Sequence, residues 1–173
     1  GQVSSEVVGA ILDELKASVP TMVLRQLESS VGTSLLDGEL STSDSVLALL
    51  DAADELAGME RRLVADAGRR LADACHAAGL LPTGVPPELV FASSGELWTR
   101  LFVDGEPRVR EVGRGYGMLD IASQPVPHLA RSVMMVGFLD RALDRAGGRD
   151  VEVRLAEGMA LGDAQDRLEA SWS

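Results

Sequence analysis

The spacing of the hydrophobic side chains changes after about residue 103, and this change limits the possible folds more than any other feature. Before that point, apolar residues recur every three or four positions, which is the period of an amphipathic α-helix. After it, short segments such as 151–155 alternate apolar and polar residues, the period of a β-strand with one buried face. Helices followed mainly by strands are typical of an α+β fold.

The first part of the chain predicts a series of helices, over 7–15, 22–27, 43–53, 59–78 and 89–102. In the longest of these, Leu63, Ala67 and Leu71 share one apolar stripe. Pro20 and Gly79 end two of the helices, because proline lacks a backbone N–H and glycine suits a helix C-terminus. We expect 32–42, which is rich in Gly, Ser and Thr, to form a loop.

The second part predicts strands over 109–112 and 116–121, a helix over 129–146, and strands over 151–155 and 167–172. Within 116–121, Tyr116 and Met118 are expected on one face of the strand and Leu119 and Ile121 on the other. The predicted fold is α+β: N-terminal helices packed on a small C-terminal antiparallel sheet, with one long helix between strands. We expect a single domain over 1–173, made of an acidic helical part (1–57) and an α+β part (58–173).

Composition excludes several classes of function. The 173 residues carry 27 acidic and 16 basic side chains, a net charge of −11, which argues against nucleic-acid binding. A single cysteine excludes a disulfide framework and any multi-cysteine metal site. No uncharged stretch is long enough to cross a bilayer, and the first residues show no basic segment followed by an apolar run. We therefore expect a cytoplasmic protein with no membrane span.

The acidic charge is concentrated at the start of the chain. Residues 1–57 carry ten acidic and two basic side chains, whereas the remainder is nearly balanced. Such an asymmetry is most often a solvated face, and the alternative is a docking surface for a basic partner.

Few residues carry a chemical signal. Gly113, Gly115 and Gly117 suggest a phosphate-binding loop, but a strand-like segment follows them where a helix would be required, so a flexible turn or a strand kink is the better interpretation. Adjacent positions on a helix point about 100° apart, so Cys75 and His76 cannot hold one metal together. We interpret His128 as a capping or surface residue, with an axial haem ligand as the alternative. We therefore predict no catalytic residue, metal or cofactor.

Two groups of residues are candidates for a site. Asp120 stands within an alternating strand, where an acid needs a partner if it is buried. Bulky side chains of the second group would line a pocket between the sheet and the long helices, with core filling as the alternative. These pocket candidates are Trp98, Phe102, Tyr116, Met118, Met134 and Phe138.

The end of the chain resembles a known family of domains. The motifs are Gly137-Phe138-Leu139, the following helix, the strand over 151–155, Leu161-Gly162-Asp163 with Asp166, and the last strand to Trp172. Together they resemble the four-vinyl-reductase-type domain and its relatives, which include haem–nitric-oxide sensor domains and uncharacterised myxobacterial paralogues. The resemblance covers about residues 55–173.

The resemblance implies an α+β fold, a tendency to dimerise, and a role in sensing or assembly without catalysis. Zinc-binding members carry cysteines where this chain has Met159 and Asp166, and the Tyr-x-Ser-x-Arg signature of haem sensors is absent. We therefore expect a non-catalytic regulatory module that binds a small apolar ligand or relays a signal to a protein partner, including a second copy of itself. The alternative is an adaptor without a ligand, which docks a basic partner through its acidic N-terminal helices.

Overall fold

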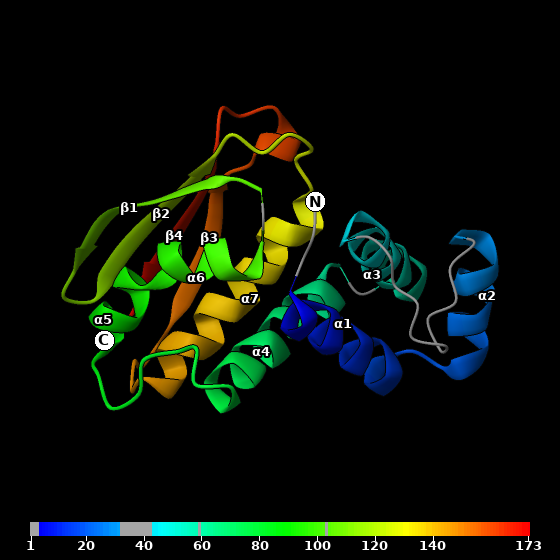
Figure 1. Cartoon of the computed structure of the whole chain (residues 1–173), viewed down its shortest axis with the longest axis horizontal. Helices are drawn as coiled ribbons and strands as arrows, with labels where there is room; N and C mark the ends of the chain where they lie inside the picture. The colour runs from blue at the N-terminus through cyan, green and yellow to red at the C-terminus, as the bar shows by residue number, and fades with distance from the viewer. Residues whose placement is uncertain (1–3, 32–42, 59, 103) are drawn as a thin grey trace.

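The computed structural model describes residues 4–31, 43–58, 60–102 and 104–173 (Figure 1). Its helices and strands follow the predicted order, and the α+β fold is confirmed. The helices are α1 (Ser5–Ser18), α2 (Thr21–Val31), α3 (Ser43–Ala57), α4 (Arg62–Ala77), α5 (Pro87–Ala92), α6 (Ser94–Leu101) and α7 (Leu129–Arg145). The strands are β1 (Glu106–Gly113), β2 (Tyr116–Ala122), β3 (Glu152–Glu157) and β4 (Asp166–Ser171), and a short 3-10 turn, η1, covers Met159–Leu161. The predicted loop over 32–42 lies outside the described residues.

One predicted helix is divided in two. Periodicity predicts a single helix over 89–102, but the chain forms α5 and α6 with a break at Ser93. The Ser93 hydroxyl donates a hydrogen bond to the carbonyl oxygen of Val90 at 2.7 Å. Serine side chains compete in this way with the regular backbone hydrogen bonds of a helix. The spacing of the apolar residues is the same on both sides of Ser93, so it does not show where the helix breaks.

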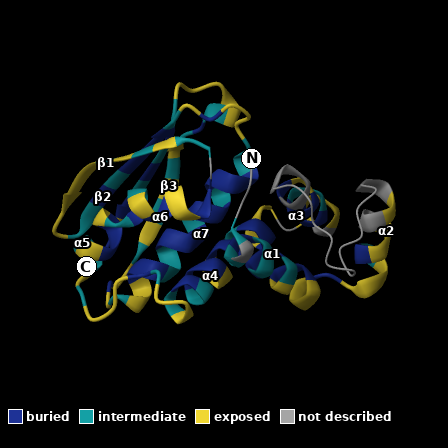
Figure 2. Cartoon of the chain, viewed as in Figure 1, coloured by how far each residue is buried: buried dark blue, intermediate teal, exposed yellow. Residues whose placement is uncertain are grey.

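The four strands form one antiparallel sheet in the order β1-β2-β4-β3. Its inner face carries Leu119, Ile121 and Leu168, all fully buried beneath the helices, and its other face is open to solvent (Figures 1 and 2). Gly115 lies in the turn between β1 and β2 with a φ of +79°, whereas Gly113 ends β1 and Gly117 lies within β2. No helix in the described part of the chain is long and apolar enough to cross a membrane.

Helices α4 and α7 pack against each other at the centre of the molecule, between the sheet and α1 (Figure 1). Two glycines permit their close approach. A Cβ atom on Gly68 would lie 1.8 Å from the carbonyl oxygen of Met134, and one on Gly137 would lie 1.9 Å from that of Ala65. Both contacts are with backbone, so a side chain at either position would push the two helices apart.

Acidic residues of the N-terminal helices hold α4 in place. Asp54 of α3 is buried and accepts hydrogen bonds from the backbone N–H groups of Arg61 (2.5 Å) and Leu63 (2.8 Å), so it caps the start of α4. The buried Glu14 of α1 forms an ion pair with Arg70 of α4. Two of the acidic side chains of the N-terminal helices therefore form intramolecular contacts with α4.

Candidate binding surface along strand β3

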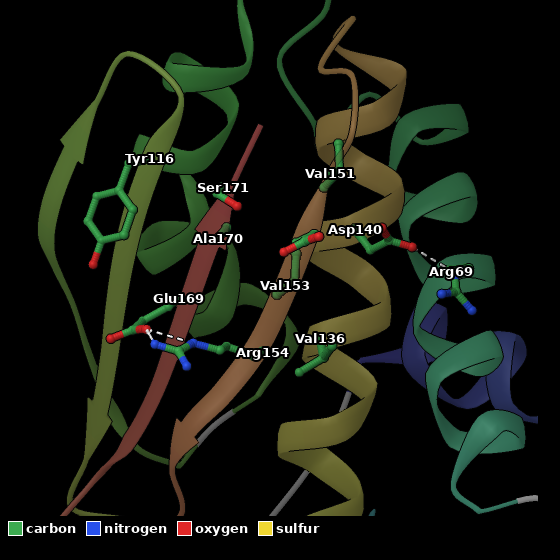
Figure 3. Close-up of a pocket in the computed structure, with 11 residues that line it drawn as sticks. Arg69, Tyr116, Val136, Asp140, Val151, Val153, Arg154, Glu169, Ala170 and Ser171 are labelled. Atoms are coloured by element: carbon green, nitrogen blue, oxygen red, sulfur yellow. Dashed lines mark hydrogen bonds and ion pairs between the residues drawn. The ribbon is translucent and has the colours of Figure 1, made fainter. Parts of the chain in front are cut away.

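A hollow of about 550 Å³ runs along β3 (Figure 3). We call it the β3-edge hollow, because β3 pairs with β4 on one side only among the described residues. Its lining comes from α4, α7 and three strands, and consists of Arg69, Tyr116, Val136, Asp140, Val151, Glu152, Val153, Arg154, Glu169, Ala170 and Ser171. These residues lie far apart in the sequence, and the fold brings them together.

The wall between β3 and α7 is apolar with a charged rim. Val136 of α7, Val151 just before β3 and Val153 of β3 are only half-buried, although they pack against the core. Beside them Arg69 of α4 donates a hydrogen bond from Nε to Oδ2 of Asp140 on α7, at 2.9 Å. This wall therefore suits apolar side chains of medium size.

The wall on the open face of the sheet is polar. Arg154 of β3 donates from Nε to Oε2 of Glu169 on β4 at 2.8 Å, and Tyr116 of β2 lies beside this pair (Figure 3). Partial burial raises the pKa of the Tyr116 phenol above its ordinary value, and the nearby carboxylates of Glu169 and Glu111 raise it further. The phenol thus remains a neutral hydrogen-bonding group.

The same open face carries an ion-pair network around Asp120. The Asp120 side chain is only 4% exposed and accepts hydrogen bonds from Arg167 Nε (2.8 Å), Arg167 Nη2 (2.9 Å) and Arg110 Nε (2.8 Å). The Arg167 guanidinium, and then that of Arg110, holds the pKa of Asp120 below its ordinary value. A carboxylate so fully occupied by guanidinium groups has a structural role and is not available as a general base.

The six predicted pocket residues lie on two sides of the sheet. Four of them, Trp98, Phe102, Met134 and Phe138, are buried in the core under the helices. Tyr116 and Met118 lie on the open face, because side chains alternate along β2 and Leu119 and Ile121 take the inner face. The structure therefore brings four of the candidates together in the core and separates the other two; of the six, Tyr116 lines the β3-edge hollow.

Beside the buried aromatic residues lies a polar cluster that the sequence reasoning missed. Asp166 is buried and accepts hydrogen bonds from Gln124 Nε2 and Ser132 Oγ, both at 2.6 Å, and from the backbone N–H of Met159 at 2.7 Å. The buried Arg131 lies next to Gln124, with its Nη1 atom 3.5 Å from Gln124 Oε1. One sequence signal could have revealed this cluster. Arg131 and Ser132 are polar residues within a segment that otherwise consists of Leu, Ala, Val and Met.

The described residues contain no group of three or more His, Cys, Asp or Glu side chains that could hold a metal ion. Cys75 is buried, and burial raises the pKa of its thiol to about 11. At neutral pH it is therefore a protonated core residue and not a thiolate ligand.

Comparison with known proteins relates this chain to others through its fold. No protein-family model matches the sequence, and no curated protein matches it either. Solved structures do match, and the fold they share with this chain is that of H-NOX domains. The resemblance to haem–nitric-oxide sensor domains is thus confirmed at the level of the fold.

Three of these structures show how far the likeness extends. An oxygen-binding H-NOX domain related to soluble guanylate cyclases has a TM-score of 0.67 and 14% identity, covering 96% of this chain and 93% of that one. An H-NOX domain studied for its activation has a TM-score of 0.71 and 13% identity, covering 100% and 97%. A variant of the T. tengcongensis H-NOX domain has a TM-score of 0.69 and 14% identity, covering 96% and 95%. The likeness therefore includes the N-terminal helices, which the motif-based resemblance over 55–173 leaves out.

The residues of this chain do not fit a haem group. The interior is filled where the core aromatic residues meet: Trp98 is fully buried, its ring centroid is 4.5 Å from that of Phe102, and the Arg131 guanidinium lies 5.5 Å from the Phe102 centroid. His76 lines a hollow of only about 60 Å³, and His128 directly precedes α7. The β3-edge hollow, of about 550 Å³, has no histidine in its lining.

Proposed function

We propose that this protein is a non-catalytic regulatory module that acts by contact with another protein chain, and that the β3-edge hollow is its contact surface. One observation carries the proposal: the interior between sheet and helices is packed with side chains, whereas a hollow of about 550 Å³ is open along an unpaired strand edge. A filled core with an accessible apolar surface is the arrangement expected of an interaction domain.

The chemistry of the hollow supports a peptide or protein partner. An edge strand offers backbone N–H and C=O groups, and an added strand binds to such groups whatever its side chains. Val136, Val151 and Val153 would receive apolar side chains, while the charged rim would select among partners. Asp120 is the candidate acid on this face, and its guanidinium partners leave it no catalytic role.

A small apolar ligand is the second candidate function. The fold supports it, since H-NOX domains of the same architecture include an oxygen-binding one. The four pocket candidates in the core, Trp98, Phe102, Met134 and Phe138, would then line a space that opens only on binding, with the buried Arg131 beside it.

Four further expectations stay predictions. The motifs at the end of the chain support kinship with four-vinyl-reductase-type domains and their myxobacterial paralogues. The length of 173 residues supports a single domain over 1–173. A cytoplasmic location rests on the sequence alone. Docking of a basic partner on the acidic N-terminal helices has weaker support, because Glu14 and Asp54 already bind groups of α4 within the chain.

Native mass spectrometry of the protein purified from its own host distinguishes the two functions. We expect a complex with a protein chain, and V151E in the β3-edge hollow should dissociate it. The matched control is V112E, at an exposed valine on β1, which should leave the complex intact. A co-purifying small molecule that is lost in W98A would replace the proposal with the ligand-binding function. A monomer without any bound partner would contradict it.

A further inference from the structure

The two edges of the sheet differ in how they resist pairing with another strand. The β1 edge has Pro107, which lacks an N–H donor, and a bulge between Val109 and Glu111. Proline and bulges are devices by which natural proteins keep an edge strand from adding a further strand. This edge is therefore protected.

The β3 edge has no such protection along its first half. Its residues Glu152 to Leu155 pair regularly with β4, and the register shifts only between Leu155 and Glu157. The segment has no proline and no lysine, and Val151, Val153 and Leu155 are left half-buried. An edge segment without proline or bulge and with apolar side chains on one face is a template for a further strand.

We propose that the strand added here is β3 of a second copy of this chain, antiparallel and related by a two-fold axis at Val153. This inference names the partner at the β3-edge hollow and so rests on the proposed function. Pairing of this kind is isologous, since each copy offers the same surface. It would join the two sheets into one and bring the apolar walls of the two hollows together.

The charge pattern of β3 fits this register. An axis at Val153 places Glu152 opposite Arg154 of the partner subunit and Val151 opposite Leu155 of the partner subunit. The axis repeats each pair, so two opposite-charge pairs form on the open face and two apolar pairs on the inner face. Directly opposite side chains in antiparallel strands stand about 4.5–5.5 Å apart at their Cβ atoms, and each opposite-charge pair there contributes a modest stabilisation.

Neighbouring registers bring like charges together at the axis. An axis at Arg154 would place Arg154 opposite Arg154 of the partner subunit. An axis at Glu152 would place Glu152 opposite Glu152 of the partner subunit. Like charges directly opposite are unfavourable. A slip by a single residue would turn one strand over. The charged side chains of that strand would then lie on the same face as the apolar side chains of the other strand.

Charge reversal tests both the partner and the register by analytical ultracentrifugation over a range of concentrations. We expect the wild-type chain to form a dimer. E152R should raise its dissociation constant on the order of tenfold or more, because two attractive pairs become repulsive. R154E should weaken the dimer as well, although Arg154 also binds Glu169 within the chain. Mixing E152R with R154E should restore a heterodimer, since both of its cross-strand pairs are again of opposite charge.

The control is E106R, a charge reversal at the exposed start of β1, which should leave the dimer unchanged. Circular dichroism checks that each variant is folded. A wild-type chain that is monomeric at every concentration would overturn the inference, as would a dimer that E106R weakens and E152R does not. A complex with a different protein that V151E dissociates would also overturn it, yet leave the proposed function standing.

Discussion

At the scale of single residues, Asp120 is the clearest case of a side chain whose environment decides its role. It stands in an alternating strand, where the sequence predicts only that a buried acid needs a partner. In the structure it lies on the open face of the sheet, yet the guanidinium groups of Arg110 and Arg167 cover it so well that only 4% of the side chain is exposed. Three hydrogen bonds satisfy the carboxylate.

We expect D120N to lower the free energy of unfolding by about 2–3 kcal/mol, because hydrogen bonds to charged groups contribute about 1.5–3 kcal/mol and an amide offers one acceptor where the carboxylate offers two. Urea denaturation measures the change. The control is E96Q, whose exposed partner Arg100 lies one helical turn away, and it should change stability by less than about 0.5 kcal/mol. Equal losses in both variants would contradict the structural role of Asp120.

The pH dependence of stability follows from the direction of the Asp120 pKa shift. Folding lowers this pKa, so the stabilisation is complete above the unfolded carboxyl pKa of about 3.9 and is lost as the pH falls through the lower folded-state value. The difference in unfolding free energy between wild type and D120N should therefore be constant near neutral pH and shrink in acid. A difference that grows on acidification would contradict this sign.

At the scale of elements, the packing of α4 against α7 depends on the two glycines at their crossing. We expect G68A and G137A each to lower the free energy of unfolding by about 1–3 kcal/mol or more, since a methyl group there meets the backbone of the other helix. The matched control is G9A on α1, where nothing lies within 4 Å of the added Cβ. That change should raise stability by about 0.5–1 kcal/mol, because alanine is the better helix former.

Thermal and urea denaturation of the three variants measure these effects. The expected opposite signs separate steric overlap at the helix crossing from the general effect of replacing a helical glycine. A stabilising G68A would show that α4 and α7 do not approach as closely as the structure places them.

At the scale of the whole molecule, the same architecture as H-NOX domains encloses an interior filled by its own side chains. We expect that the protein, incubated with hemin and passed through a gel-filtration column, retains no stoichiometric haem by its absorbance in the Soret region. H76A and H128A should leave the spectrum unchanged. A stoichiometric complex whose spectrum changes in H128A would contradict the packing around Trp98 and Phe102.

The local periodicity of the sequence determined the elements and their order. Helical and alternating spacing predicted α4, α7, β3 and β4, and the alternation in 116–121 placed Tyr116 and Leu119 on opposite faces, because these patterns reflect which side of an element is buried. Periodicity did not reveal the break at Ser93, where one side-chain hydrogen bond interrupts a continuing apolar pattern.

Only the tertiary structure decided what the elements form together. The sheet order leaves β3 at an edge and β2 inside, so it sets which strand can take a partner; no local pattern encodes that order. Asp120 with Arg167, Asp166 with Ser132, and Glu14 with Arg70 join residues far apart in the chain. Such contacts exist only after folding, because each depends on the relative placement of elements and not on the properties of a single segment.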